Sequence, residues 1–188
     1  MTLHLRDIAS TRFGVHAKRL DHGKMALVQS SAILDGGIIN HDYIARTAPE
    51  TIRFKEVDLL QEGDVLLIGK GSSNIAAIWP GSSEDTVASS MLYVIRPDRS
   101  LVEPAYLAGY LNSRPAQAQM AAFVKRGTIP VLGRKALDEL QVPVPPFEEQ
   151  HKLMRLTDAM QRAQLIQEQL NQAYAQLLNA VWATYPER

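Results

Sequence analysis

The residues that could carry out catalysis are few and widely spaced along this chain. The segment Gly69–Ser73 combines glycine, lysine and serine, but it lacks the leading glycine and the Lys-Ser/Thr order of a phosphate-binding Walker loop. Asp64 and Lys70 could form the carboxylate–lysine pair of a nuclease, yet no acidic residue stands directly before the lysine. The histidines form no H-x-x-x-H pair for a metal, and no G-x-S-x-G nucleophile motif occurs. These patterns favour a binding module over an enzyme, with a divergent nuclease as an alternative.

Composition narrows the class of protein further. The chain has 188 residues, 46% of them hydrophobic, which suffices for one domain with a core plus an appendage. Lys+Arg and Asp+Glu number 20 each, so a strongly basic nucleic-acid coat is excluded, whereas a local basic patch is not. The absence of cysteine excludes disulfides, thiolate zinc sites and a cysteine nucleophile. The sequence shows neither a secretory signal pattern nor an apolar run of membrane-spanning length, so we expect a cytoplasmic protein.

The pattern of residues that predicts secondary structure, and with it the elements that would position a site, changes near residue 146. Before this point, short apolar runs bounded by Gly, Pro and Ser predict strands joined mainly by hairpins, and prolines at first helical positions predict helices. We therefore expect an α/β (α+β) domain over residues 1–146, with a small mixed or antiparallel sheet. The expected strands are Met25–Gln29, Asp64–Ile68, Ile75–Trp79 and Met91–Ile95, and the expected helices are Ala105–Leu111 and Ala116–Lys125.

Residues 147–185 predict one long helix. A helix from Phe147 to Trp182 would be about 54 Å long at 1.5 Å per residue, which exceeds what one face of the domain needs. Its apolar residues follow the alternating spacing of coiled-coil a and d positions, which favours an arm with a partner helix over a terminal helix packed on its own sheet. The candidate dimer interface is Leu153, Leu156, Met160, Ala163, Gln167, Leu170, Tyr174, Leu177 and Val181.

The polar residue Gln167 lies at the midpoint of the a-position series. An antiparallel pair with its two-fold axis near Gln167 would place Leu153 opposite Val181 and Met160 opposite Tyr174. A buried polar a residue can fix register and orientation. The sequence therefore predicts an antiparallel homodimer, although a partly exposed and merely tolerated Gln167 is the simpler explanation.

Four segments together resemble the specificity subunit of type I restriction-modification systems. Leu60–Ile68, with Gly71 behind it, resembles the family's L-x-x-GDVL strand, and Pro104–Ser113 resembles its P-x-[FY]-L-x-x-x-L-x-S helix. Gly127–Leu132 resembles the G-S/T-x-x-P-x-L turn, and Val142–Gln150 resembles the PxPPxxEQ entry to the family's conserved helix. Order and spacing also match over nearly the whole chain.

The resemblance implies a half-length subunit, because family members usually carry two target-recognition domains and two conserved helices. Residues 1–146 would be one target-recognition domain that binds double-stranded DNA, and residues 147–185 one dimerisation helix. The implied partners are a methyltransferase subunit and possibly a restriction subunit. The chain would need no cofactor and carry no catalysis. A homodimer would recognise an interrupted palindromic site.

A DNA-recognition domain needs loops with Arg, Lys, Asn, Gln, Ser and Thr, which bind base edges and phosphates. Three loop segments of the chain, with one further residue at a strand end, fit this need. The candidates are Arg12, His16, Lys18 and Arg19 in an irregular N-terminal loop, Gln29 at a strand end, Lys70, Ser72, Ser73 and Asn74 between two strands, and Lys125, Arg126, Thr128, Arg134 and Lys135 around a helix end. Each also has a simpler explanation, such as a solvated loop or a charge that complements a helix dipole. A protein–protein adaptor that never contacts DNA remains the alternative function.

Overall fold

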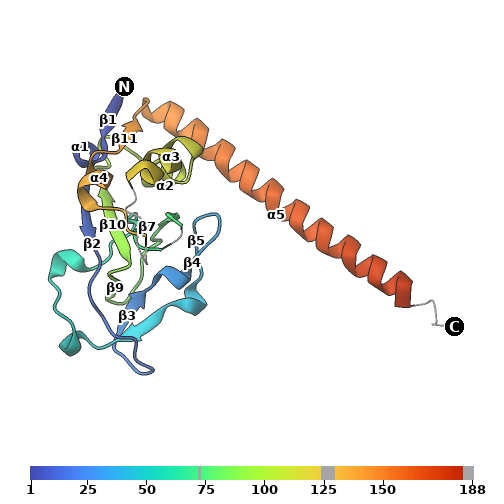
Figure 1. Cartoon of the computed structure of the whole chain (residues 1–188), viewed down its shortest axis with the longest axis horizontal. Coiled ribbons are helices and arrows are strands. Elements are labelled where there is room, and N and C mark those ends of the chain that lie inside the picture. The colour runs from blue at the N-terminus through green and yellow to red at the C-terminus, as the bar shows by residue number, and fades with distance from the viewer. Residues whose placement is uncertain (72, 124–129, 184–188) are drawn as a thin grey trace.

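The computed structural model describes residues 1–71, 73–123 and 130–183. Short strands and helices alternate in the N-terminal three quarters of the chain, and one long helix follows (Figure 1). The strands are β1 (Thr2–His4), β2 (Ala9–Phe13), β3 (Met25–Val28), β4 (Ile33–Leu34), β5 (Ile38–Ile39), β6 (Ala45–Thr47), β7 (Val65–Ile68), β8 (Ala76–Ile78), β9 (Thr86–Ala88), β10 (Leu92–Pro97) and β11 (Gln141–Pro143). The helices are α1 (Leu5–Ile8), α2 (Pro104–Leu111), α3 (Arg114–Phe123), α4 (Arg134–Asp138) and α5 (Phe147–Ala183), with 3₁₀ turns η1 (Ser30–Ala32), η2 (His41–Tyr43), η3 (Pro49–Thr51) and η4 (Glu56–Asp58).

An antiparallel sheet with the order β2-β10-β7-β8 forms the centre of the fold. Alternate residues of a strand point to opposite faces, and here both faces are covered. Val65 and Leu67 of β7 belong to one core cluster, whereas Leu66 and Ile68 belong to another. The unbroken apolar run of β7 therefore reflects burial on both sides.

Helices cover one face of this central sheet. Leu107 and Leu111 of α2 and Met120 of α3 pack with α1, α4 and the sheet in one core cluster. The β1–β11 pair closes the edge of this layer, and joins the N-terminus to the segment just before α5. This pairing explains why Val142, which precedes Pro143, is fully buried.

A second, smaller sheet lies against the other face. Its order is β6-β3-β9, in which β3 pairs antiparallel with β6 and parallel with β9. The β4–β5 hairpin lies beside it, and Ala32, Ile33 and Trp79 share the core between the sheets. This layer carries the loops that follow β2 and β3.

Helix α5 is anchored at its base and then leaves the globular part. Gln150 is 0% exposed, and its side-chain oxygen accepts a hydrogen bond from the Glu103 backbone N–H at 2.9 Å. Its amide nitrogen donates to the carbonyls of Pro145 at 2.8 Å and Leu101 at 3.2 Å. Beyond Thr157 no other described element lies beside the helix (Figure 1), and its a and d leucines are exposed.

The structure confirms the expected strands and helices to within a few residues, including α5, which is about 55 Å long at 1.5 Å per residue. The expectation that residues 12–19 form an irregular loop is wrong at its start, because Arg12 lies within strand β2 and pairs with Val94. The end of the helix predicted at Ala116–Lys125 lies outside the described residues. No described helix combines the length and apolar character that a bilayer-spanning segment requires.

Candidate nucleic-acid interface

Three chain segments converge at one end of the central sheet. The antiparallel pairing brings the ends of β2 and β7 together with the starts of β8 and β10, so Phe13, Ile68, Ala76 and Leu92 lie at the same end. We call this the loop end. Six of the ten candidate DNA-contacting residues that the structure describes lie at or beside this end.

The loop after β7 is held by the segment just before α4. Leu132 donates its backbone N–H to the Gly69 carbonyl at 2.9 Å, and Gly71 donates to the Pro130 carbonyl at 3.0 Å. Lys70 forms an isolated bridge with Val131 between these bonds. Two segments that are about 60 residues apart in the chain, around Lys70 and Val131, are thereby fixed side by side, and α4 with its exposed cations follows directly.

An aromatic stack supports Lys70. The rings of Phe13 and Tyr93 stack with centroids 4.1 Å apart, and the Lys70 ammonium lies 5.2 Å from the Phe13 centroid, within cation–π range. The Tyr93 hydroxyl donates to the Leu132 carbonyl at 2.8 Å, and burial raises the pKa of Tyr93 to about 12. A Cβ on Gly69 would lie 2.5 Å from the Tyr93 ring, so only glycine lets the chain pass this stack.

His16 joins the loop end from the N-terminal side. Its Nδ1 lies 3.2 Å from the Ser90 hydroxyl, in the turn between β9 and β10. Gly14 makes this approach possible, because a side chain there would collide with the carbonyl oxygens of Ala88 and Ser89. His16 therefore lies beside the turn that leads into the central strand.

Arg12 points to the other face of the sheet and belongs to a charged cluster. Asp64 is 1% exposed and forms a bidentate pair with Arg96, with both N–O distances 2.7 Å, and Arg12 lies 3.7 Å from the same carboxylate. Burial, together with the charge of Arg96, lowers the pKa of Arg12, whereas the hydrogen bond that Arg96 donates to Asp64 raises the pKa of Arg96. Arg96 also donates to the Leu59 carbonyl, so the cluster ties the segment around η4 to the sheet. This geometry favours a structural role for Arg12 over a DNA contact.

The structure brings together only some of the predicted site residues. Lys18 and Arg19 are exposed but lie next to β6, where the Thr47 hydroxyl donates a hydrogen bond to the Lys18 carbonyl. Gln29 follows β3 and precedes η1. Asn74 uses its amide to donate to the Ile68 carbonyl at 2.7 Å. Those at or beside the loop end are His16, Lys70, Ser73, Asn74, Arg134 and Lys135, and those outside the described residues are Ser72, Lys125, Arg126 and Thr128.

Two features of this region were missed by sequence reasoning. The Phe13–Tyr93 stack could not be predicted, because it depends on the register of β2 against β10. The role of Arg96 in the charged cluster had only a weak indication in the sequence, where Arg96 is a lone cation at the end of an apolar strand. Within the described parts of the chain, no group of three or more potential metal ligands occurs.

The structure thus defines a small mixed-sheet domain with polar loops at one end, followed by a long helical arm. The chain belongs to the family of type I restriction modification DNA specificity domains, whose model matches residues 7–174. A search of curated proteins gives no match.

Solved structures share this mixed fold of small antiparallel sheets and helices. The HsdS subunit from Thermoanaerobacter tengcongensis has a TM-score of 0.66 and 20% identity, over 92% of this chain and 45% of that one. The type I restriction-modification S subunit from M. genitalium has a TM-score of 0.60 and 16% identity, over 96% and 46%. A chain from a study of complex assembly and conformational transition in the type I R-M system has a TM-score of 0.72 and 18% identity, over 100% and 50%. This chain thus spans about half the length of each.

Proposed function

We propose that this chain is a DNA-recognition module of a type I restriction-modification system. Residues 1–146 form the target-recognition domain and residues 147–185 the dimerisation helix. The chain has no catalytic site of its own, and positions a methyltransferase subunit, and in the full complex a restriction subunit, on DNA. The family assignment supports this role, and the half-length coverage of the solved relatives supports a module that works as one of two halves.

The observation that carries the proposal is the convergence of cationic and polar loops at the loop end. Lys70 is fixed over Phe13, and the exposed Arg134 and Lys135 follow the segment that pairs with Lys70. The chain has no net charge, so DNA affinity requires such local segregation of cations. Rigidly held loops of this kind can contact phosphates and base edges without a large ordering cost.

We further propose that two copies pair through α5 in antiparallel orientation. Leu156, Met160, Leu170 and Leu177 are exposed at a and d spacing, and beyond Thr157 no other described element lies beside the helix (Figure 1). An isolated helix of this kind gains most of its stability from packing of such a face. With the axis near Gln167, the pair would hold two inverted domains apart, as recognition of an interrupted palindrome requires.

Fluorescence anisotropy with a labelled random-sequence duplex over a salt series tests DNA binding. We expect affinity to fall steeply with salt, and the Lys70→Ala/Arg134→Ala variant to lower the log–log slope by about 0.9 for each phosphate that it no longer neutralises. Lys55→Ala removes an exposed cation near the opposite end of β7 and serves as the control for loss of positive charge. No binding at low salt, or equal slopes for the two variants, would contradict the proposed interface.

A further inference from the structure

The backbone just before His16 is fixed to the turn that joins β9 to β10. Gly14 donates its N–H to the Leu92 carbonyl at 2.9 Å, and Val15 donates to the Ala88 carbonyl at 2.8 Å. The part of the N-terminal loop that carries His16 is therefore held against the sheet. A contact between His16 and a ligand would require little further ordering of the chain, which favours a specific interaction.

The His16 side chain has one ring nitrogen that is held by the protein and one that is free. Nδ1 lies 3.2 Å from the Ser90 hydroxyl. The residue is exposed, and no group in the described parts of the chain forms a hydrogen bond with Nε2. The contact with Ser90 limits rotation of the ring, so Nε2 is held in a defined position and remains open to a ligand.

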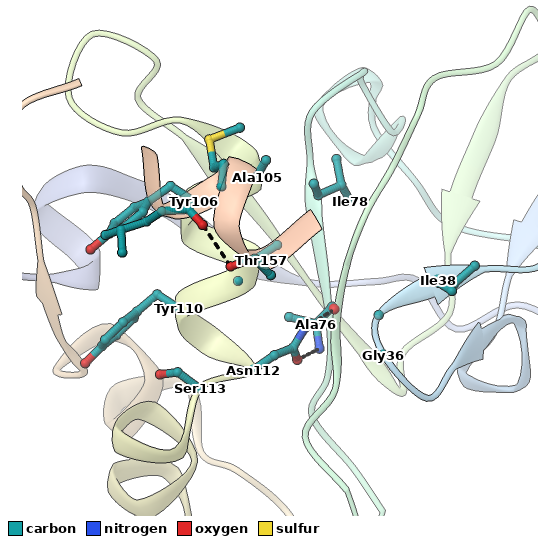
Figure 2. A pocket seen from close by; sticks show the side chains of 15 residues that line it. Gly36, Ile38, Ala76, Ile78, Ala105, Tyr106, Tyr110, Asn112, Ser113 and Thr157 are labelled. Atoms are coloured by element: carbon teal, nitrogen blue, oxygen red, sulfur yellow. Dashed lines mark hydrogen bonds between the residues drawn. The ribbon is translucent and has the colours of Figure 1, made fainter. Parts of the chain in front are cut away.

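Polar side chains around the cleft at the base of α5 differ in this respect, because they bond to the chain itself. Figure 2 shows the Asn112 amide turned toward Ala76 of β8. It donates to the Ala76 carbonyl and accepts from the Ala76 N–H, both at 2.8 Å. The Tyr106 hydroxyl donates to the Pro143 carbonyl at 2.8 Å. These groups stabilise the fold, whereas Nε2 of His16 is available at the loop end.

The contact with Ser90 also bears on the chemical group that Nε2 presents. In a neutral imidazole one ring nitrogen donates and the other accepts. A Ser90 hydroxyl that donates to Nδ1 places the N–H on Nε2, and a doubly protonated ring has an N–H there as well. In the major groove guanine offers two neighbouring acceptors, N7 and O6, whereas adenine has an amino group beside N7. A single N–H donor therefore favours guanine.

Lys70 is tied to the same turn. Gly69 donates its N–H to the carbonyl of Met91, the residue after Ser90, at 3.0 Å. A phosphate contact by Lys70 and a base contact by His16 would thus be spaced by one rigid turn. Phosphate contacts set the register of a protein on the duplex, and base contacts specify the sequence. The loop end combines a residue suited to each task.

We propose that His16 recognises guanine in the major groove through an N–H donated by Nε2, and that Ser90 is the positioning residue that holds the ring and its tautomer. This inference rests on the proposed DNA-recognition function and assigns one base-specific contact within it. In an inverted homodimer the contact occurs once in each half-site, at symmetry-related guanines.

Selection of bound duplexes from a random-sequence pool by the full-length chain identifies the recognised site, and affinities are then measured after each G·C pair is changed to A·T. Wild type should lose about 10-fold in affinity at one pair in each half-site, and His16→Ala should bind both duplexes within about 2-fold of each other. His16→Gln keeps an amide donor near the position of Nε2 and should retain part of the preference. Ser90→Ala should weaken it. The matched control is His22→Ala, an exposed histidine of the same loop, which should retain it fully.

The variants separate the possible failures. Loss of the preference for guanine in His16→Ala, with the preference retained in His22→Ala, supports the inference. If His16→Ala still prefers every guanine of the site, or loses a preference for another base instead, the inference is overturned and the DNA-recognition function stands. A Ser90→Ala variant that matches wild type would overturn the positioning role of Ser90. A wild-type chain that selects no sequence would overturn the proposed function together with the inference.

Discussion

Substitution of Gln150 by alanine tests whether one side chain anchors α5 to the domain. Gln150 is fully buried, and it links the backbone before α2, at Leu101 and Glu103, to the backbone before α5, at Pro145. Alanine keeps the helix propensity but removes all three hydrogen bonds. The backbone N–H of Glu103 and the carbonyls of Leu101 and Pro145 then lose their partner at a partly buried junction.

The expected cost follows from these hydrogen bonds. Each contributes about 1 kcal/mol net, so the free energy of unfolding should fall by roughly 3 kcal/mol. With a urea m-value of about 2 kcal/mol/M, the unfolding midpoint should fall by about 1.5 M.

Urea unfolding followed by circular dichroism measures this shift. Gln172→Ala removes an exposed glutamine from the same helix and should leave the free energy of unfolding unchanged within about 0.5 kcal/mol. If the Gln150 variant unfolds at the same urea concentration as this control, Gln150 does not anchor the helix.

Three further predictions concern the dimer and the core. Leu170→Glu should raise the dimer Kd more than about 100-fold, because each buried leucine contributes about 3 kcal/mol to the free energy of dimerisation. Gln176→Glu, on the opposite face of the helix, should leave the Kd unchanged. Sedimentation equilibrium measures the Kd of both variants. Asp64→Asn should lower the free energy of unfolding by about 3 to 5 kcal/mol, measured by thermal or urea unfolding, because it leaves two arginines without their shared buried carboxylate. The control Asp35→Asn changes an exposed carboxylate and should lower it little. Equal losses for the two variants would refute the stabilising role of the ion cluster. The raised pKa of Tyr93 keeps its phenol neutral in the folded chain, so stability should be lost as pH rises from about 10 to about 12, and Tyr93→Phe should show a smaller loss over this window.

The elements with strong local signals could be predicted from the sequence. The apolar run of β7, the prolines before α2 and α3, and the heptads of α5 each specify their element within a few residues. The β1–β11 pair could not be predicted, because its short strands are joined only by contacts across almost the whole domain. Strand β2 could not be recognised because its sequence, Ala-Ser-Thr-Arg-Phe, has a buried Thr11 and a half-buried Arg12 where apolar residues would indicate a strand.

In the candidate site, too, some features could be predicted from the sequence and others could not. Glycines and cations near Lys70 marked a binding loop in the sequence, and the structure places this loop beside the segment before α4. Sequence could not distinguish Lys70, which is held over an aromatic ring, from Arg12, whose guanidinium faces a buried carboxylate. Both are cations in polar segments, and only the strand register decides which face of the sheet each one meets.

Genome-wide mapping of methylated bases, in cells with this chain and in cells from which it has been deleted, tests the central claim most directly. A DNA-recognition module that acts as an inverted pair predicts one class of methylated sites, an interrupted palindrome, that disappears on deletion and returns when the chain is restored. Methylation that is identical with and without the chain would contradict the account.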